Sequence, residues 1–153
     1  MRLTVHTDYA LRVLIFLGVE PQRLATIREI SEHYDISRNH LMKIVNELAA
    51  AGYVESVRGK NGGIRLGRAP ADVGIGTVVR HMEDNFHLVG CFNPDAPTCR
   101  IEPACLLSGV LQTALDEFLA VLDRWTLADL VAPKADLAGL LDLAQKTDQP
   151  LRT

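Results

Sequence analysis

All three cysteines of this 153-residue chain, Cys91, Cys99 and Cys105, lie within fifteen positions of one stretch, CFNPDAPTCRIEPAC. Thiolates bind soft metal ions and form disulfides. The C-x7-C-x5-C spacing lacks the C-x2-C pair of zinc ribbons and the runs of ferredoxins, so spacing alone does not select one metal. Thiolates in a loop with several prolines and few acids suit iron, and the stretch therefore favours an iron–sulfur cluster.

Two other chemistries fit the same thiols. His87 stands four positions before Cys91 and could complete a Cys3His zinc site. Alternatively, Cys99 and Cys105 could form a redox-sensitive disulfide that leaves Cys91 spare. Catalysis is not expected, because the sequence contains no H-E-x-x-H, no G-x-S-x-G and no phosphate loop. We therefore expect a protein that is not an enzyme.

The first half of the chain has the pattern of three helices and a β-hairpin. Candidate N-caps precede helical apolar periodicity at Thr7, Thr26 and Ser37, and Gly18 and Gly52 are candidate ends of the first and third helices. After the third helix, YVESV and IRL alternate like strands around the turn RGKNGG. The pattern predicts a mainly α fold, a winged helix-turn-helix with a β-hairpin wing.

In such a fold the second helix of the helix-turn-helix enters the major groove, and cations on the wing hold phosphates. We therefore expect binding to double-stranded DNA, although helix-turn-helix units also serve as packing modules. His40 has an alternative role, because it lies beside the apolar face and could pack against the second helix. The expected DNA contacts are Arg38, Asn39, His40 and Lys43 on the helix, with Arg58, Lys60 and Asn61 on the wing.

The net charge of −3 hides an asymmetry between the two halves. Residues 1–68 carry ten Lys/Arg against seven Asp/Glu, whereas residues 69–153 carry six against twelve. A basic first half fits a nucleic-acid partner. The apolar run VLIFLGV is far shorter than the ~20 residues that span a bilayer, and no signal-peptide cleavage site follows it. We expect a cytoplasmic protein with no membrane partner.

The second half is expected to carry one helix, IGTVVRHMED, before the cysteines and a long amphipathic helix after them. On the long helix, apolar residues at spacings of 4, 3, 4 and 3 form a coiled-coil seam: Leu111, Leu115, Phe118, Leu122 and Trp125. Burial against the chain's own core is the alternative. A two-fold dimer would read a palindromic operator. We therefore expect a homodimer with three regions: a DNA-binding domain at 1–68, a cluster-binding loop and dimerisation helix at 69–131, and a tail at 132–153.

Four stretches together resemble the nitric-oxide-sensing repressors among the Rrf-type winged-helix regulators: MRLTVHTDYALRVLIFL, SRNHLMKIVNELAAAGYVESVRGKNGGIRLG, PAC and LDRWTLADLV. The resemblance covers most of residues 1–131. It implies a homodimeric repressor that binds a 4Fe-4S cluster, with 2Fe-2S as the alternative, and releases its operator when the cluster is nitrosylated. It also implies the cluster ligands, which are Cys91, Cys99, Cys105 and Asp8 of the partner subunit.

The chain departs from the family in two places. A close relative that monitors iron–sulfur assembly has a histidine three residues after its last cysteine, where this chain has Ser108. The first two cysteines also lie further apart than in the repressors it resembles, which indicates an insertion around NPDAP. Asp8 has a simpler alternative role as a first-turn acid that interacts favourably with the helix dipole. A regulator that senses redox or iron–sulfur status remains the alternative function.

Overall fold

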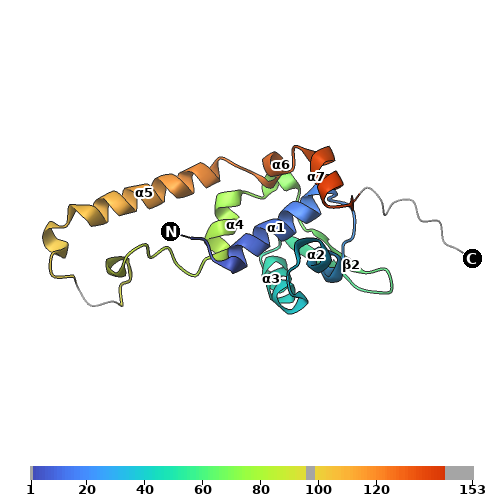
Figure 1. Ribbon diagram of the computed structural model, residues 1–153, viewed down its shortest axis with the longest axis horizontal. Coiled ribbons are helices and arrows are strands. Elements are labelled where there is room, and N and C mark those ends of the chain that lie inside the picture. Colours follow the sequence, from blue (N-terminus) through green and yellow to red (C-terminus); the bar gives the residue numbers. More distant parts are fainter. Residues whose placement is uncertain (1, 96–98, 144–153) are drawn as a thin grey trace, which may run out of the picture.

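The computed structural model of the protein describes residues 2–95 and 99–143. The first part, residues 2–68, is called the head, and it confirms the predicted fold, three helices followed by a two-stranded wing (Figure 1). The helices are α1 (Val5–Val19), α2 (Ile27–Tyr34) and α3 (Arg38–Ala50), and the wing strands are β1 (Val54–Val57) and β2 (Gly63–Leu66).

Helix α1 begins earlier than its sequence pattern indicates. Thr4, rather than Thr7, is the N-cap, and the Thr4 hydroxyl accepts a hydrogen bond from the Thr7 backbone N–H at 3.2 Å. Thr7 itself is fully buried in the first turn. The expected cap at Thr7 is therefore wrong. A contact from a distant residue explains the difference, because Glu83 accepts hydrogen bonds from the backbone N–H and the hydroxyl of Thr4, at 2.7 and 3.1 Å.

The other two helices of the head begin where the caps predict. The hydroxyl of Thr26 accepts from the N–H of Glu29 at the start of α2, and Ser37 accepts from the N–H of His40 at the start of α3. Beyond the end of α3, Gly52 has a positive φ of 75°, a backbone conformation in which a residue with a side chain would be strained. These local signals are short-range, which is why the sequence pattern located them.

The wing is a regular antiparallel hairpin. Its register pairs Glu55 with Arg65, and the two side chains form an ion pair across the strands. On its other side β2 joins the head through Ala25, whose backbone exchanges two hydrogen bonds with Ile64, at 2.7 and 2.9 Å. The turn between the strands needs Gly59, with a φ of 120°. The base of the wing is thus held to the segment between α1 and α2, and the tip of the wing projects into solvent.

The head supplies the larger part of one continuous apolar core, to which residues 73–82 and 127–143 also contribute. Six large side chains are less than 2% exposed: Phe16, Leu14, Ile30, Leu41, Ile44 and Leu48. They come from all three helices of the head, so these helices pack about one centre. Burial of each side chain of this size stabilises the folded protein by about 1.5–3 kcal/mol. The core fixes the orientation of α3, whose other face remains in solvent.

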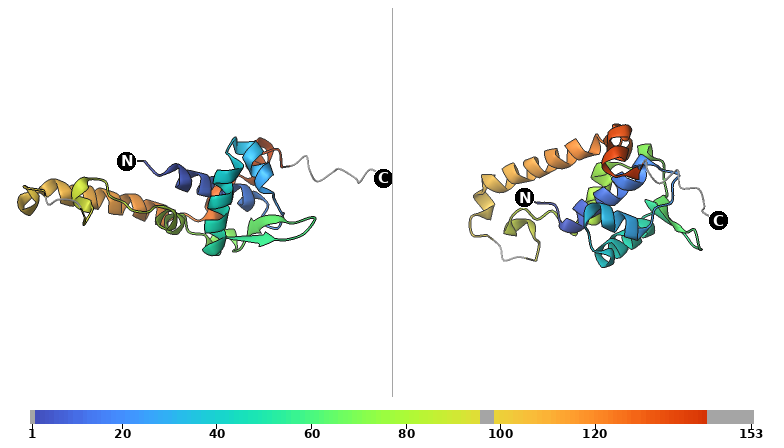
Figure 2. Two further views of the ribbon diagram at one scale, coloured as in Figure 1. Left: turned by 90° about the horizontal axis from the view of Figure 1, so that it is seen from below. Right: turned by 45° about the vertical axis from the view of Figure 1, so that its right-hand side comes forward.

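The second half adds a helical cap to the head and a projecting arm. The elements in chain order are a 3-10 turn η1 (Pro70–Asp72), α4 (Ile75–Met82), two further 3-10 turns, η2 (Gly90–Phe92) and η3 (Glu102–Ala104), then α5 (Leu106–Asp123), α6 (Leu127–Leu130) and α7 (Lys134–Leu140). The described part of residues 83–123, called the arm, extends away from the head (Figures 1 and 2). Within the arm, residues 91–95 and 99–105, called the cysteine segment, run beside α5. None of the described helices is both long and apolar enough to cross a membrane.

The arm is anchored at the C-terminal end of α5. Arg80 of α4 donates two hydrogen bonds to the carboxylate of Asp123, at 2.5 and 2.8 Å. This contact lowers the pKa of Asp123 below its usual value. Gly76 makes the close approach of the two helices possible, because a Cβ there would lie 2.0 Å from Oδ1 of Asp123. Backbone hydrogen bonds then continue the attachment, from Ile75 N–H to the Trp125 carbonyl oxygen.

Two predicted regions lie partly outside the described residues. The insertion around NPDAP includes residues 96 and 97, and the tail at 132–153 includes residues 144–153. In the described part of the tail, Leu141 and Leu143 are buried and join the core. The start of that tail therefore packs onto the body of the molecule.

Candidate DNA interface and cysteine segment

The solvent face of α3 carries the polar side chains expected to read DNA. Arg38, Asn39 and Lys43 are all exposed. Within the described residues, none of the three side chains forms a hydrogen bond or an ion pair, so their donors are free for an external partner. The apolar face of the same helix fixes its rotation, because Leu41 and Ile44 are completely buried. The structure therefore gathers three of the four predicted helix contacts on one open surface.

The fourth, His40, is half-buried and packs against a neighbouring helix. Its ring stacks on His6 with 5.7 Å between centroids and meets Tyr9 edge-on at 5.1 Å. Both partners belong to α1, whereas the packing alternative considered for His40 placed it against the second helix. His40 thus joins the solvent face of α3 to the first turns of α1.

The wing divides its cations into two groups. Arg58, Lys60 and Asn61 are exposed at the tip, and neither Arg58 nor Lys60 forms an ion pair in the described part of the chain. Arg65 is instead paired with Glu55. Arg68 donates hydrogen bonds to two carbonyl oxygens at the end of α3, those of Ala51 and Gly52, at 2.7 and 3.1 Å. The tip cations remain available for phosphate, whereas the other two arginines stabilise the fold.

The three cysteines occupy separate points along the arm. Cys91 lies in η2, Cys99 in irregular chain, and Cys105 at the N-cap position of α5. All three thiols are free; Cys91 and Cys99 are exposed and Cys105 is half-buried. No group of three or more His, Cys, Asp or Glu side chains among the described residues is close enough to hold a metal ion. The single chain therefore supplies the thiolates but does not bring them together.

The zinc and disulfide alternatives concern the same segment. His87 and Cys91 line one shallow hollow, together with Phe86, Phe92 and Gln112 of α5. A zinc site would need the other two thiols at this hollow as well. A disulfide between Cys99 and Cys105 is not formed in this structure.

Asp8 lies in the first turn of α1, at the edge of the head. Its carboxylate pairs with Arg12 one turn later, with 2.8 Å between Nη2 and Oδ2, and the Asp8 side chain is 47% exposed. The Arg12 guanidinium also lies over the rings of Tyr9 and Tyr34, and burial raises the pKa of Tyr34. The expected first-turn position of Asp8 is confirmed. A second hydrogen bond, from Nε of Arg12 to Oδ1 at 3.1 Å, completes the pair, and about half of the Asp8 side chain remains in solvent.

Helix α5 presents apolar side chains on two adjacent strips. Leu115 of the predicted seam is buried, and Leu122 is partly buried against the chain's own core. A second strip, with spacings of 3, 4 and 7, faces solvent at Leu107, Val110, Ala114 and Val121. Leu107 and Val110 are 61% and 63% exposed. The expected seam is therefore partly used within the chain, and the neighbouring strip is the one left open.

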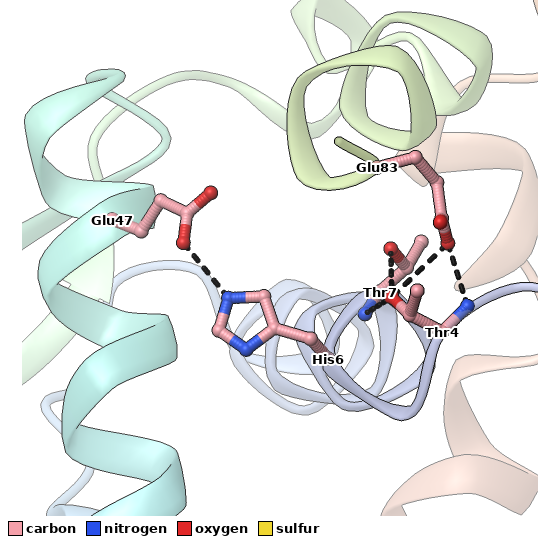
Figure 3. Close-up of polar contacts among 5 residues, drawn as sticks. All are labelled: Thr4, His6, Thr7, Glu47 and Glu83. Carbon is pink, nitrogen blue, oxygen red and sulfur yellow. Dashed lines mark hydrogen bonds and ion pairs between the residues drawn. The ribbon is translucent and has the colours of Figure 1, made fainter. Parts of the chain in front are cut away.

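Sequence reasoning missed the carboxylates that hold the first turn of α1. His6 forms a hydrogen bond with Glu47 of α3, with 2.8 Å between Nε2 and Oε2. On the other side of the turn, Glu83 binds Thr4, as Figure 3 shows. The partners are 41 and 79 positions apart in sequence. No spacing rule connects residues at such separations, so no local signal could have found them.

Comparison with known proteins agrees with this arrangement. Residues 3–133 match the model of the Rrf2 family, described as an iron-dependent transcriptional regulator. The HTH-type transcriptional regulator NsrR of Bacillus subtilis is 52% identical over 146 residues, covering 95% of this chain and all of the relative. NsrR of Halalkalibacterium halodurans is 45% identical over 144 residues, covering 94% and 99%. These relatives are named as transcriptional regulators, which are not enzymes.

Solved structures share the fold. IscR of T. potens superposes with a TM-score of 0.68 over 99% of this chain and 94% of its own, at 22% identity, which supports the fold alone. CymR of B. subtilis, described as the global cysteine regulator, superposes with a TM-score of 0.66 over 86% of this chain and 97% of its own, at 27% identity. With the family model matched over most of its length and a relative more than half identical, this chain belongs to the Rrf2 family of transcriptional regulators.

Proposed function

We propose that the protein is a homodimeric, DNA-binding repressor that senses nitric oxide through an iron–sulfur cluster. The observation that carries the proposal is the pairing, in one chain, of an open DNA-reading face on α3 with three free thiols confined to the arm. The similarity to regulators named NsrR supports it. The sequence resemblance to nitric-oxide-sensing repressors is the reason for proposing nitric oxide as the signal.

The donor set suits such a cluster. The proposed ligands are Cys91, Cys99 and Cys105 of one subunit and Asp8 of the partner subunit, and 4Fe-4S is the proposed cluster type. Thiolates are the usual protein ligands of iron–sulfur clusters. A bound cluster would supply iron that reacts with nitric oxide. Carboxylate is a harder ligand than thiolate, so Asp8 is the weakest ligand of the four.

The open strip on α5 is the proposed dimer contact. Leu107 and Val110 form a continuous apolar surface that a single chain leaves in water, and a second copy of the same helix would cover it. Because the arm projects from the head, such a contact would place the head of each subunit near the arm of the other (Figure 2). This arrangement would let Asp8 of the partner subunit reach the cysteine segment.

Operator binding follows from two heads held at a fixed spacing. In each head, Asn39 and Lys43 would read base edges, and Arg58 and Lys60 of the wing would hold phosphates. To hold the cluster of the other subunit, the Asp8 carboxylate would have to give up or share its contacts with Arg12. Loss of that attachment would free the first turn of α1 from the partner's arm and change the spacing of the two α3 helices. Each bidentate hydrogen-bonded pair with a base that is lost would cost about 1–3 kcal/mol.

The proposal is tested on the full chain purified without oxygen. The absorption spectrum, iron and sulfide content, and operator affinity are measured before and after titration with nitric oxide. About four irons per chain, as the proposed cluster requires, bleaching on titration and a parallel loss of operator binding support it. Cys99→Ala is expected to lose both iron and specific operator binding, whereas Arg100→Ala, a change at the exposed neighbouring position without a proposed ligand role, should retain them.

A redox regulator without metal is the second candidate, in which the free thiols of Cys99 and Cys105 would form the disulfide. It predicts a colourless protein whose operator affinity changes with a reversible disulfide. A Cys99→Ala variant that binds its operator tightly without iron would refute the cluster-dependent mechanism.

A further inference from the structure

We propose that the hydrogen bond between His6 and Glu47 is a positioning contact through which the first turn of α1 controls the placement of the recognition helix α3. The inference rests on the proposed function, in which Asp8 binds the cluster across the dimer and α3 reads the operator. It names the contact within the head through which a displacement of the turn that carries Asp8 would change the position of the helix with the proposed DNA contacts.

The contact joins two elements whose relative position decides DNA binding. His6 lies in the first turn of α1 and Glu47 near the C-terminal end of α3, and Figure 3 shows the imidazole and the carboxylate pointing toward one another. The side chains are 29% and 40% exposed, so the bond is partly shielded from water. Because an ionised carboxylate only accepts, Nε2 of His6 donates.

A second point of contact makes the junction resistant to rotation. The ring of His40 stacks on His6 and meets Tyr9 edge-on. His40 and Glu47 are two turns apart on one face of α3, and His6 and Tyr9 are one turn apart on one face of α1. The backbone positions of His40 and Glu47 are therefore about 10 Å apart along α3, although both side chains contact His6. A shift of the first turn of α1 must move α3 or break one of these contacts.

The same turn is also fastened on the side of the cysteine segment. Glu83, the C-cap of α4, accepts hydrogen bonds from Thr4 at the beginning of α1, and the chain continues from Glu83 toward Cys91. The first turn of α1 is thus held between the arm and the recognition helix. A displacement at Asp8 in this turn would act on both neighbours, and His6 makes the contacts on the side of α3.

The residues around the contact are those expected to touch the operator. His6 lines a small open pocket together with Asn39, His40 and Lys43. Lys43 lies between His40 and Glu47 on α3, one turn from each. A change in the position of His6 therefore alters the surroundings of Asn39 and Lys43 directly.

The experiment measures a ratio, the operator affinity of the cluster-loaded homodimer divided by that of the same protein after nitric oxide. His6→Phe keeps the ring contact with His40 and removes the donor, and Glu47→Ala removes the acceptor. We expect each to lower the ratio by about three- to tenfold, the range open to one partly exposed hydrogen bond of ordinary net strength. The double variant should fall no further than either single variant.

Two controls separate positioning from other effects. His6→Gln places an amide N–H near the position of Nε2 and should restore most of the ratio. Glu32→Ala removes another surface carboxylate of the head, one paired with Arg28, and should shift affinity in both states without changing the ratio. Iron content and absorption spectrum should match the wild type in every variant.

The outcomes distinguish the inference from the proposed function. A wild-type ratio of one refutes the cluster-dependent function and the inference with it. A normal wild-type ratio that persists in both His6→Phe and Glu47→Ala overturns the inference alone. Loss of iron in both variants would also overturn it, because the contact would then serve cluster retention instead of transmission.

Discussion

The head and the arm differ in how much of their apolar surface one chain can bury. In the head, Phe16, Leu41 and Ile44 are at most 1% exposed, and three helices share one core. In the arm, Leu115 is the buried side chain of α5, while Leu106 is 86% exposed. The head therefore buries its large apolar side chains within one chain, whereas the arm leaves apolar side chains of α5 in solvent. A DNA-binding unit can be complete in one chain, whereas the proposed sensor, which joins two subunits, would need the second one.

The largest expected effect comes from the core of the head. Phe16→Ala should lower the free energy of unfolding by roughly 3–5 kcal/mol, because it leaves a cavity among side chains from all three helices. Leu106→Ala in the arm should change it by no more than about 0.5 kcal/mol. Urea denaturation followed by circular dichroism measures both. Equal effects of the two substitutions would contradict the difference between the regions.

A charge on the open strip of α5 should break the dimer without unfolding the head. Val110→Lys is expected to raise the dimer dissociation constant by about a hundredfold or more, because a buried unpaired charge costs several kcal/mol. Asp116→Lys places the same side chain on the side of α5 away from this strip and should leave association intact. Sedimentation velocity decides between them, and a Val110→Lys variant that remains dimeric would place the interface elsewhere.

Substitutions on the solvent face of α3 should act on DNA and not on the signal. Asn39→Ala is expected to weaken operator binding by about 1–3 kcal/mol in both cluster states, because it removes a contact to a base edge. Arg65→Ala, whose side chain already pairs with Glu55, should have a smaller effect. Fluorescence anisotropy with a labelled operator measures both affinities. If Asn39→Ala weakened operator binding in only one cluster state, DNA contact and sensing could not be assigned to two separate regions of the molecule.

The smallest expected effect concerns the joint between the regions. Arg80 lowers the pKa of Asp123, first through hydrogen bonding. A carboxylate with a depressed folded-state pKa stabilises the protein above its ordinary pKa, about 4, and this contribution disappears as the pH falls through the lower folded value. The half-exposed Trp125 should report the loosened joint as a fluorescence change in that acid range. Asp123→Asn should lack this change, whereas a change of the same size in the variant would assign it to another group.

The sequence predicted the parts of the site that depend on neighbours in the chain. Ser37 begins α3 as expected, because an N-cap satisfies backbone N–H groups only three residues away. Asn39 and Lys43 are exposed as expected, because helical periodicity assigns them to the face opposite Leu41. The gathering of the three cysteines in one segment is also a property of the sequence alone. Their role as ligands remains a prediction.

Only the tertiary structure could decide contacts between residues far apart in the chain. Glu83 accepts a hydrogen bond from Thr4, the N-cap of α1, and Glu47 of α3 forms a hydrogen bond with His6. Neither carboxylate belongs to a local motif. The covered strip of α5 likewise depends on distant residues, because Leu122 packs against the core and Leu115 lines a hollow with Phe86. Periodicity shows which side chains share a face of a helix, but the packing of the whole chain determines which neighbour, if any, covers that face.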